Sequence, residues 1–155
     1  EAEETMRAWG LFIYDDVYNV NDMRLKIKKH KLQGGADVVC VDFIQNIGGE
    51  GTLYERISDA IVKLQKMARE LEVTMLVVSQ VSNEAMRSNS EIIGLKGAGE
   101  LSAAADIILW LKRVKGEGNE KHLDCEIKKN RPFGKTGIVP LMFNEMWSKI
   151  LRRGF

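Results

Sequence analysis

The chain has 155 residues, of which 45% are hydrophobic and 29% are charged, and its formal net charge at pH 7 is +1. This length suits one domain that buries roughly 70% of its unfolded surface, and a charge so close to zero excludes a global attraction to DNA or to membranes. No apolar run approaches the roughly 18 residues that a membrane span needs. The acidic start EAEETMRAWG is unlike a signal peptide. We therefore expect a single-domain, cytoplasmic protein with no membrane partner.

Hydrophobic periodicity predicts alternating helices and strands over most of the chain. The predicted helices are 1–9, 21–33, 52–71 and 101–105. The predicted strands are 11–16, 37–43, 73–80 and 106–113. Asn21 is a candidate N-cap for the second helix, which should stop at Gly34-Gly35. Thr52 and Glu55 have the spacing of a capping box at the start of the third helix.

The pattern changes after Gly116, where short apolar runs alternate with Gly and Asn. The runs are 122–130, 137–143 and 145–151. They predict an antiparallel meander. The fold class is therefore α/β, with mostly parallel strands flanked by helices and an antiparallel β-rich C-terminal part.

The strand predicted at 37–43 contains the nearly continuous apolar run VVCV, which is typical of a parallel strand that is covered on both faces. Cys40 belongs to this run and Cys125 to a later strand-like run, and neither has CxxC spacing. Two buried free thiols are therefore expected in place of a disulfide or a metal pair.

Polar side chains follow two of the predicted parallel strands, where ligands of such sheets bind. Asp42 ends the run VVCV, and Gln80 ends the run TMLVVSQ. Asp42 by itself could simply cap a turn. With Gln80 at the matching end of the next strand, the pair favours a nucleotide–Mg²⁺ site, in which one carboxylate faces the metal and a neutral amide faces a phosphate.

A second candidate is the cationic segment KKNRPFGKTG, which contains Lys128, Lys129, Arg131 and Lys135. Its GKT resembles the end of a Walker A loop, but the first Gly of that pattern would fall at position 129, which is Lys. The segment is therefore either a solvated hairpin turn or a basic finger that faces phosphate. An arginine suits the second role because it stays charged and offers several fixed donors.

Four stretches in order carry a family resemblance: VVCVDFIQNI, LQKMARELEVTMLVVSQVSNEAM, GLKGAGELSAAADIILWLKR and KNRPFGKTGIVPLMFN. Together they resemble the C-terminal motor domain of DnaB-type replicative helicases, which are hexameric RecA-like ATPases. The resemblance covers about residues 11 to 150. It implies a RecA-like fold, ATP and Mg²⁺ as cofactors, and a role in DNA replication.

The resemblance also implies roles for the nucleotide-site residues. Asp42 matches the Walker B aspartate that orients Mg²⁺ through water, and Gln45 matches the glutamine that follows it in that motif. Gln80 matches the glutamine that couples the γ-phosphate to the DNA-binding loops. Lys129 and Arg131 match a pair that reaches into the ATP site of the neighbouring subunit, with the arginine as a finger in trans.

Further implied contacts concern DNA and protein partners. Lys96, Gly97 and Gly99 match a loop that contacts the phosphates of single-stranded DNA, by charge and by close backbone approach. This chain has Lys96-Gly97 where relatives often have Arg-Glu, so a side-chain contact from the second position is in doubt. The implied partners are single-stranded DNA, five further copies of the chain in a hexamer, and possible primase and helicase-loader proteins.

The family's Walker A loop and catalytic glutamate precede the first strand found in this chain. We therefore interpret residues 1–155 as a single partial RecA-like domain that is inactive by itself. In RecA-like sheets the P-loop strand lies between the strand that ends at Gln80 and the strand that begins at Asp106. The edges of these two strands are therefore expected to pair with each other or with a second chain.

Two rival interpretations remain. A RecA- or RadA-like recombinase shares Asp42, the long helix and a KNR-like segment, although LKGAGELSAAAD and the β-rich tail favour the helicase. A non-catalytic module that binds DNA or a helicase is the alternative from another class.

Overall fold

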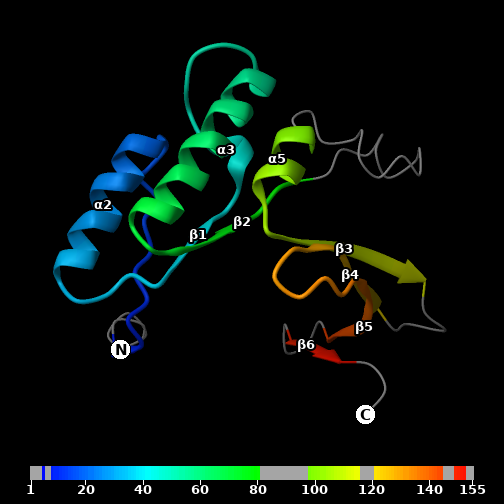
Figure 1. Cartoon of the computed structure of the whole chain (residues 1–155). Coiled ribbons are helices and arrows are strands. Elements are labelled where there is room, and N and C mark those ends of the chain that lie inside the picture. Colours follow the sequence, from blue (N-terminus) through cyan, green and yellow to red (C-terminus); the bar gives the residue numbers. More distant parts are fainter. Residues whose placement is uncertain (1–4, 6–7, 81–97, 116–120, 145–148, 153–155) are drawn as a thin grey trace. The chain divides into compact units, whose positions relative to one another are not determined.

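Two separate sheets organise the chain, of which the computed structural model describes residues 5, 8–80, 98–115, 121–144 and 149–152 (Figure 1). The chain divides into two compact units, Glu1–Ala104 and Ala105–Phe155. In the first unit, β1 (Val38–Val41) and β2 (Thr74–Val77) pair in parallel. In the second, β3 (Ile107–Lys115), β4 (Lys121–Asn130), β5 (Gly137–Asn144) and β6 (Lys149–Arg152) form an antiparallel meander. The predicted α/β class, with parallel strands followed by an antiparallel part, is confirmed.

Helix α3 (Leu53–Glu70) supplies more of the buried core of the first unit than any other element that the structure describes. Its buried side chains follow one stripe at helical spacing: Ile57, Ala60, Ile61, Leu64 and Met67. The predicted capping box is present, because Thr52 Oγ1 accepts from the Glu55 amide and the Glu55 carboxylate accepts from the Thr52 amide at 2.7 Å. The short helix α5 (Ala98–Ala104) packs against α3. Gln65 Nε2 of α3 donates to the Ala104 carbonyl of α5 at 2.9 Å.

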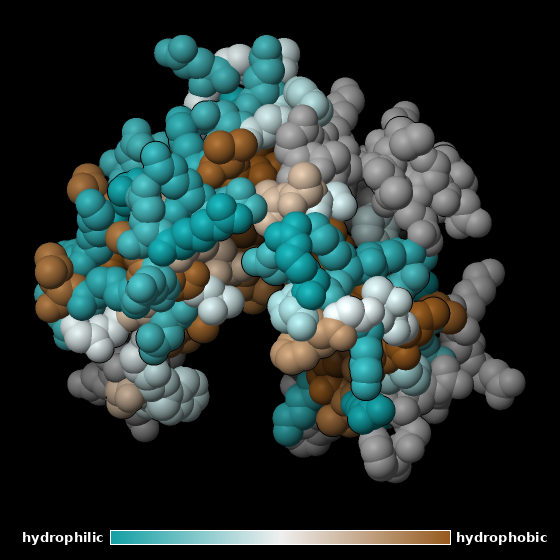
Figure 2. Space-filling model, in the orientation of Figure 1, coloured by the Kyte–Doolittle hydropathy of each residue, from teal (hydrophilic) through white to brown (hydrophobic). Residues whose placement is uncertain are grey.

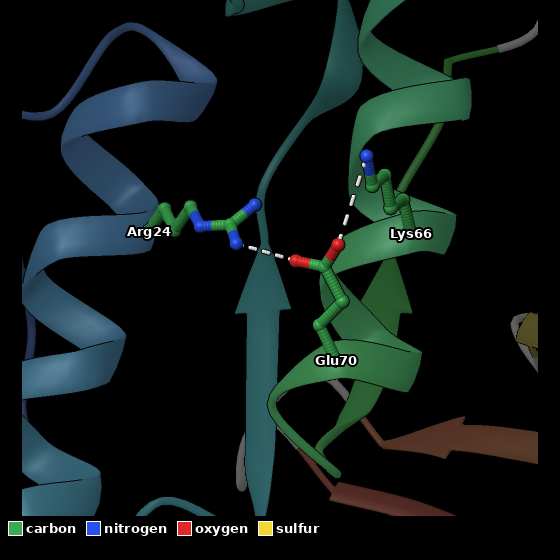
Figure 3. A network of polar contacts seen from close by, with 3 residues as sticks. All are labelled: Arg24, Lys66 and Glu70. Carbon is green, nitrogen blue, oxygen red and sulfur yellow. Dashed lines mark hydrogen bonds and ion pairs between the residues drawn. The ribbon is translucent and has the colours of Figure 1, made fainter.

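Helix α2 (Val20–Leu32) lies beside α3 (Figure 1). Its N-cap is Asn19, whose side chain accepts from the Asp22 amide, so the predicted cap at Asn21 is wrong by two residues. The predicted stop is confirmed by Gly34, whose φ of +95° suits glycine. Glu70 of α3 joins the two helices because its carboxylate pairs with Arg24 of α2 and, at 3.7 Å, with Lys66 (Figure 3).

The parallel strands bury one face in the described structure. Val39 and Val41 of β1 and Met75 and Val77 of β2 belong to or pack against the helical core, whereas the alternate positions are exposed. The expectation of two covered faces is therefore wrong for the described residues. Cys40 is exposed as a result, and Cys125 is half-buried, so the predicted buried thiols are not found, although both cysteines are free.

Segment 11–16 is not a strand, contrary to the prediction, because it has no hydrogen-bonded strand neighbour in the part of the chain that is described. Its aromatic side chains lie on α2 instead. Tyr14 Oη is 2.7 Å from His30 Nε2, the Phe12 ring stacks on His30, and Lys26 lies over the Tyr14 ring at 4.3 Å.

The two strands that flank the predicted P-loop position belong to different units, and the pairing expected for their edges remains a prediction. β2 is hydrogen-bonded to β1 and β3 to β4, and the two pairs belong to different sheets. Exposed apolar side chains on β3 include Leu109 and Leu111, and Figure 2 shows hydrophobic residues on this antiparallel sheet and a mainly hydrophilic surface over α2 and α3. Within the residues described, no helix combines the length and the apolar character that crossing a bilayer requires.

Replacing the central core residue should destabilise the first unit strongly. Met67 is 1% exposed, so Met67→Ala leaves a cavity and should lower the free energy of unfolding by about 2–5 kcal/mol in urea denaturation. Val62→Ala is the matched control on the same helix, because Val62 is 62% exposed and should change little. Equal effects of the two substitutions would contradict the position of α3.

Candidate nucleotide site at the carboxyl edge of the parallel strands

Asp42 and Gln80 leave the sheet at the same edge. β1 and β2 are parallel and Val41 pairs with Val77, so the residues that follow each strand emerge side by side. The Val78 amide donates to the Val41 carbonyl at 2.9 Å, and the Ile44 amide donates to the Val78 carbonyl at 2.9 Å. Both Asp42 and Gln80 are exposed. The structure thus brings together the two residues that the sequence pairs, although their binding roles remain predictions.

Gln45 links the segments that carry these two residues. It lies in the short 3₁₀ helix η1 (Ile44–Asn46), and its half-buried side chain reaches the end of the β2 segment. Its Nε2 donates to the Gln80 carbonyl and to Ser79 Oγ, both at 3.0 Å, and its Oε1 accepts from the Gln80 amide at 3.3 Å.

This reciprocal bonding has the pattern of one more pair in a β-ladder. Because β1 ends at Val41, the backbone of Gln80 has no continuing strand beside it there, and the side-chain amide of Gln45 takes the place of that strand. A primary amide suits this role because it donates and accepts at once. The contacts therefore make Gln45 a residue that positions Gln80, in addition to the nucleotide contact predicted for it.

A Mg²⁺ ion would fit the edge as a partner of Asp42. The described residues contain no group of three or more His, Cys, Asp or Glu side chains that could hold a metal ion. Mg²⁺ binds hard oxygen ligands, usually keeps several waters and uses one or two carboxylates together with substrate phosphates. One exposed carboxylate at Asp42 meets that requirement when a phosphate supplies the rest.

A groove of about 440 Å³ lies elsewhere, at the N-terminal ends of α2 and α3. Among its lining residues, Asp59 and Lys63 pair with each other at 2.7 Å. Glu55 caps α3, and the hydrogen bonds from Thr52 hold the pKa of that carboxyl below its usual value. These three charged groups of the groove therefore have structural partners, and the residues that line the groove include none of Asp42, Gln45 and Gln80.

The cationic segment forms the end of β4 and the turn to β5 in the second unit. Lys128 Nζ pairs with Glu126 at 2.6 Å, and this hydrogen bond is the main cause that lowers the pKa of Glu126. Arg131 Nη1 pairs with Asp106 Oδ1 at 2.7 Å, and Asn130 Nδ2 donates to the Lys135 carbonyl at 2.9 Å. The segment thus forms a hairpin turn in which two cations have carboxylate partners, and the contact with phosphate remains a prediction.

The other predicted site residues belong to the second unit, to α5 or to the part of the chain that the structure does not describe. Lys129 lies in β4, in the same unit as Arg131, whereas Asp42, Gln45 and Gln80 belong to the first unit. Gly99 lies in α5, while Lys96 and Gly97 fall outside the described residues.

Two supporting residues escaped the sequence analysis. Ser79 was seen only as part of a strand, and Asp106 only as the start of one. Their partners, Gln45 and Arg131, are 34 and 25 residues away in the chain. The strand order and register that join them are not local signals.

Taken together, the parallel strands with an acid and an amide at one carboxyl edge and the antiparallel part that follows agree with the RecA-like fold that the resemblance implies. A family model described as "DnaB-like helicase C terminal domain" matches residues 1–152. The chain belongs to this family.

Individual relatives agree with the family. The chain is 28% identical over 154 residues to the replicative DNA helicase DnaB of Geobacillus stearothermophilus, covering 92% of this chain and 34% of the relative. It is 31% identical over 158 residues to a probable plasmid replicative DNA helicase of Chlamydia muridarum, covering 96% and 34%. The chain thus spans about a third of the length of these relatives.

Solved structures show the same fold. A DnaB-like replicative helicase, described with its interactions with primase, matches with a TM-score of 0.74 and 27% identity over 86% of this chain and 34% of that one. A solved ATPase domain matches with a TM-score of 0.75 and 27% identity over 88% and 52%. A KaiC-like protein of Pyrococcus horikoshii, at 15% identity and a TM-score of 0.68, covers 98% and 64% and shows the fold alone.

Removing the side-chain amide of Gln45 should reduce the hydrogen-exchange protection of the Gln80 backbone amide specifically. Gln45→Met keeps a side chain of similar length without its hydrogen bonds, each of which contributes about 0.5–1.5 kcal/mol. Hydrogen exchange of the Gln80 amide should therefore become roughly 5- to 30-fold faster. The control is Gln65→Met, which removes another half-buried glutamine whose amide bonds to the Ala104 carbonyl. If Gln45→Met leaves the Gln80 amide as protected as Gln65→Met does, the link does not hold Gln80.

Proposed function

We propose that this chain is the C-terminal part of the motor domain of a hexameric replicative DNA helicase, which moves along single-stranded DNA and parts the duplex at the expense of ATP bound between subunits. The observation that carries the proposal is the family match over residues 1–152, together with the exposed acid and amide at one edge of β1 and β2. The intact protein is accordingly an ATP-dependent DNA helicase.

In this proposal four residues have different roles at the nucleotide: Asp42, Gln80, Lys129 and Arg131. Asp42 would hold Mg²⁺ through water, and the ion would supply positive charge that stabilises the phosphates of ATP. Gln80 donates to the γ-phosphate from a neutral amide, so it senses the phosphate without repelling it. Lys129 and Arg131 face the ATP of the neighbouring subunit, where the guanidinium stabilises charge that develops during phosphoryl transfer.

The DNA contact is assigned to the segment that follows Gln80. Lys96 would neutralise a phosphate, and Gly97 and Gly99 would allow the backbone to approach the strand closely. Gln80 precedes this segment in the chain, and the family resemblance gives it the role of coupling the γ-phosphate to the DNA contact. A primase and a helicase loader are the further partners proposed, the first because one structural relative was described with primase.

The helicase proposal is favoured over the two rivals. A RecA- or RadA-like recombinase shares the fold, but the matching family and the named relatives are replicative helicases. The same family match favours the helicase over a non-catalytic module.

As a 155-residue polypeptide, the chain should not hydrolyse ATP. Its sequence contains no GxxxxGK[ST], so the β- and γ-phosphates lack the backbone cradle and the lysine that hold them in this class of ATPase. Phosphate release should stay at background with and without single-stranded DNA. Turnover that depends on Asp42 would show that the chain carries a phosphate site of its own.

The finger role of Arg131 is tested in full-length protein that carries this chain. Rings of Arg131→Ala subunits should lose ATPase activity roughly thousand-fold or more, and rings of Asp42→Asn subunits should also be inactive. Rings that mix the two should recover activity, because an Asp42→Asn subunit still offers its arginine to the intact site of an Arg131→Ala neighbour.

Lys135→Ala is the control for charge, since it removes another exposed cation of the same turn. It should leave turnover within about two-fold, as is usual for exposed positions. Full activity in pure Arg131→Ala rings would refute the finger, and inactive mixed rings would refute its action in trans.

A further inference from the structure

Arg131 is held at two points by one residue of the neighbouring strand. Its amide donates to the Asp106 carbonyl at 2.9 Å, and its Nη1 donates to Asp106 Oδ1 at 2.7 Å. Asp106 immediately precedes β3, and Arg131 immediately follows β4. The contact therefore closes the ladder between these strands at the point where β4 enters its turn.

A β-bulge in β4 creates this pairing. Leu109 pairs with Ile127, but the preceding residue of β3, Ile108, pairs with Lys129, so Lys128 is an extra residue in β4. Had the first register continued, Asn130 would lie opposite Asp106. The inserted residue places Arg131 there instead. Bulges often re-aim side chains beside functional sites.

The carboxylate contributes little to the fold by itself. The side chains of Arg131 and Asp106 are 52% and 66% exposed, and exposed ion pairs are screened by water and salt. The contact instead restricts the rotamers of the long Arg131 side chain. A guanidinium carries five N–H donors, more than the contact with the one oxygen of Asp106 requires.

We propose that Asp106 is a positioning residue for Arg131, holding the guanidinium in an ordered position until a phosphoryl group of the neighbouring subunit's ATP binds it. This inference rests on the proposed function, because it gives Asp106 a role only if Arg131 acts on phosphate. A pre-ordered arginine loses less freedom when the transition state forms, and misplacement of such a group lowers the rate of the chemical step.

The test uses full-length protein with Asp106→Ala, Asp106→Asn and, as a control, Glu126→Gln. Glu126 is matched because it is a carboxylate of the same sheet that pairs with Lys128 and Lys112 and not with Arg131. Asp106→Ala should lower kcat roughly ten-fold with little change in the KM for ATP. The kcat of Asp106→Asn should lie between those of Asp106→Ala and the wild type, because the amide oxygen can still accept a hydrogen bond from Arg131. The kcat of Glu126→Gln should resemble that of the wild type.

A binding cycle separates positioning from general damage. Asp106→Ala should weaken binding of ADP with aluminium fluoride, which mimics the transferring phosphoryl group, roughly ten-fold while leaving ADP binding unchanged. In an Arg131→Ala background the same substitution should have no further effect, because Asp106 acts through Arg131.

Each outcome decides between the two claims. Normal kcat and analogue binding in Asp106→Ala, with a severe Arg131→Ala defect, would overturn the positioning role and leave the proposed function intact. A further loss of binding in the Arg131→Ala background would show that Asp106 is merely structural. An increase in the kcat of Asp106→Ala would show that Asp106 keeps Arg131 away from the phosphoryl group, which would also overturn the inference. Wild-type behaviour of Arg131→Ala itself would remove the proposed finger.

Discussion

The parallel pairing of β1 with β2 is the constraint on which the candidate nucleotide site depends. The inward side chains Val39, Val41, Met75 and Val77 meet the apolar stripe of α3, and this alternation fixes the register of both strands. A shift of β2 by one residue would turn Thr74 and Leu76 toward the core and would move Gln80 relative to Asp42. The hydrophobic pattern that stabilises the first unit therefore also sets the spacing of its two exposed polar residues.

Beyond the ends of these strands, the side chain of Gln45 forms the hydrogen bonds to the Gln80 backbone that a paired strand would otherwise form. The Gln45 amide offers one donor group to both Ser79 Oγ and the Gln80 carbonyl and one acceptor to the Gln80 amide. A glutamate at this position would lose the donor and add negative charge close to a proposed triphosphate. A neutral amide satisfies the backbone and remains electrostatically compatible with phosphate, which explains why this residue type suits the position.

The elements with strong local signals were predictable from the sequence, and those that depend on distant partners were not. The capping box at Thr52, the stripe of α3 and the glycine stop after α2 all follow from residues within a few positions of each other. Segment 11–16 has the composition of a strand, but composition does not show whether a neighbouring strand is available. Asp42 and Gln80 were predictable because parallel strands share a carboxyl edge. The contact between Asp106 and Arg131 was not, because it depends on a one-residue bulge at Lys128 that apolar alternation does not reveal.

The two residues proposed to meet phosphate, Gln80 and Arg131, are both exposed and are both bonded by a side chain that is distant in sequence. Gln45 bonds the backbone of Gln80, whereas Asp106 bonds the guanidinium of Arg131. Without its carboxylate partner, the exposed Arg131 side chain would sample many rotamers and would lose that freedom only when the nucleotide binds. Support from a neighbouring element reduces this loss without burying the group. In the proposed ring, Arg131 would have to be ordered before it meets the neighbouring subunit's nucleotide and would still have to be accessible to it, and an exposed side chain with a carboxylate partner meets both conditions.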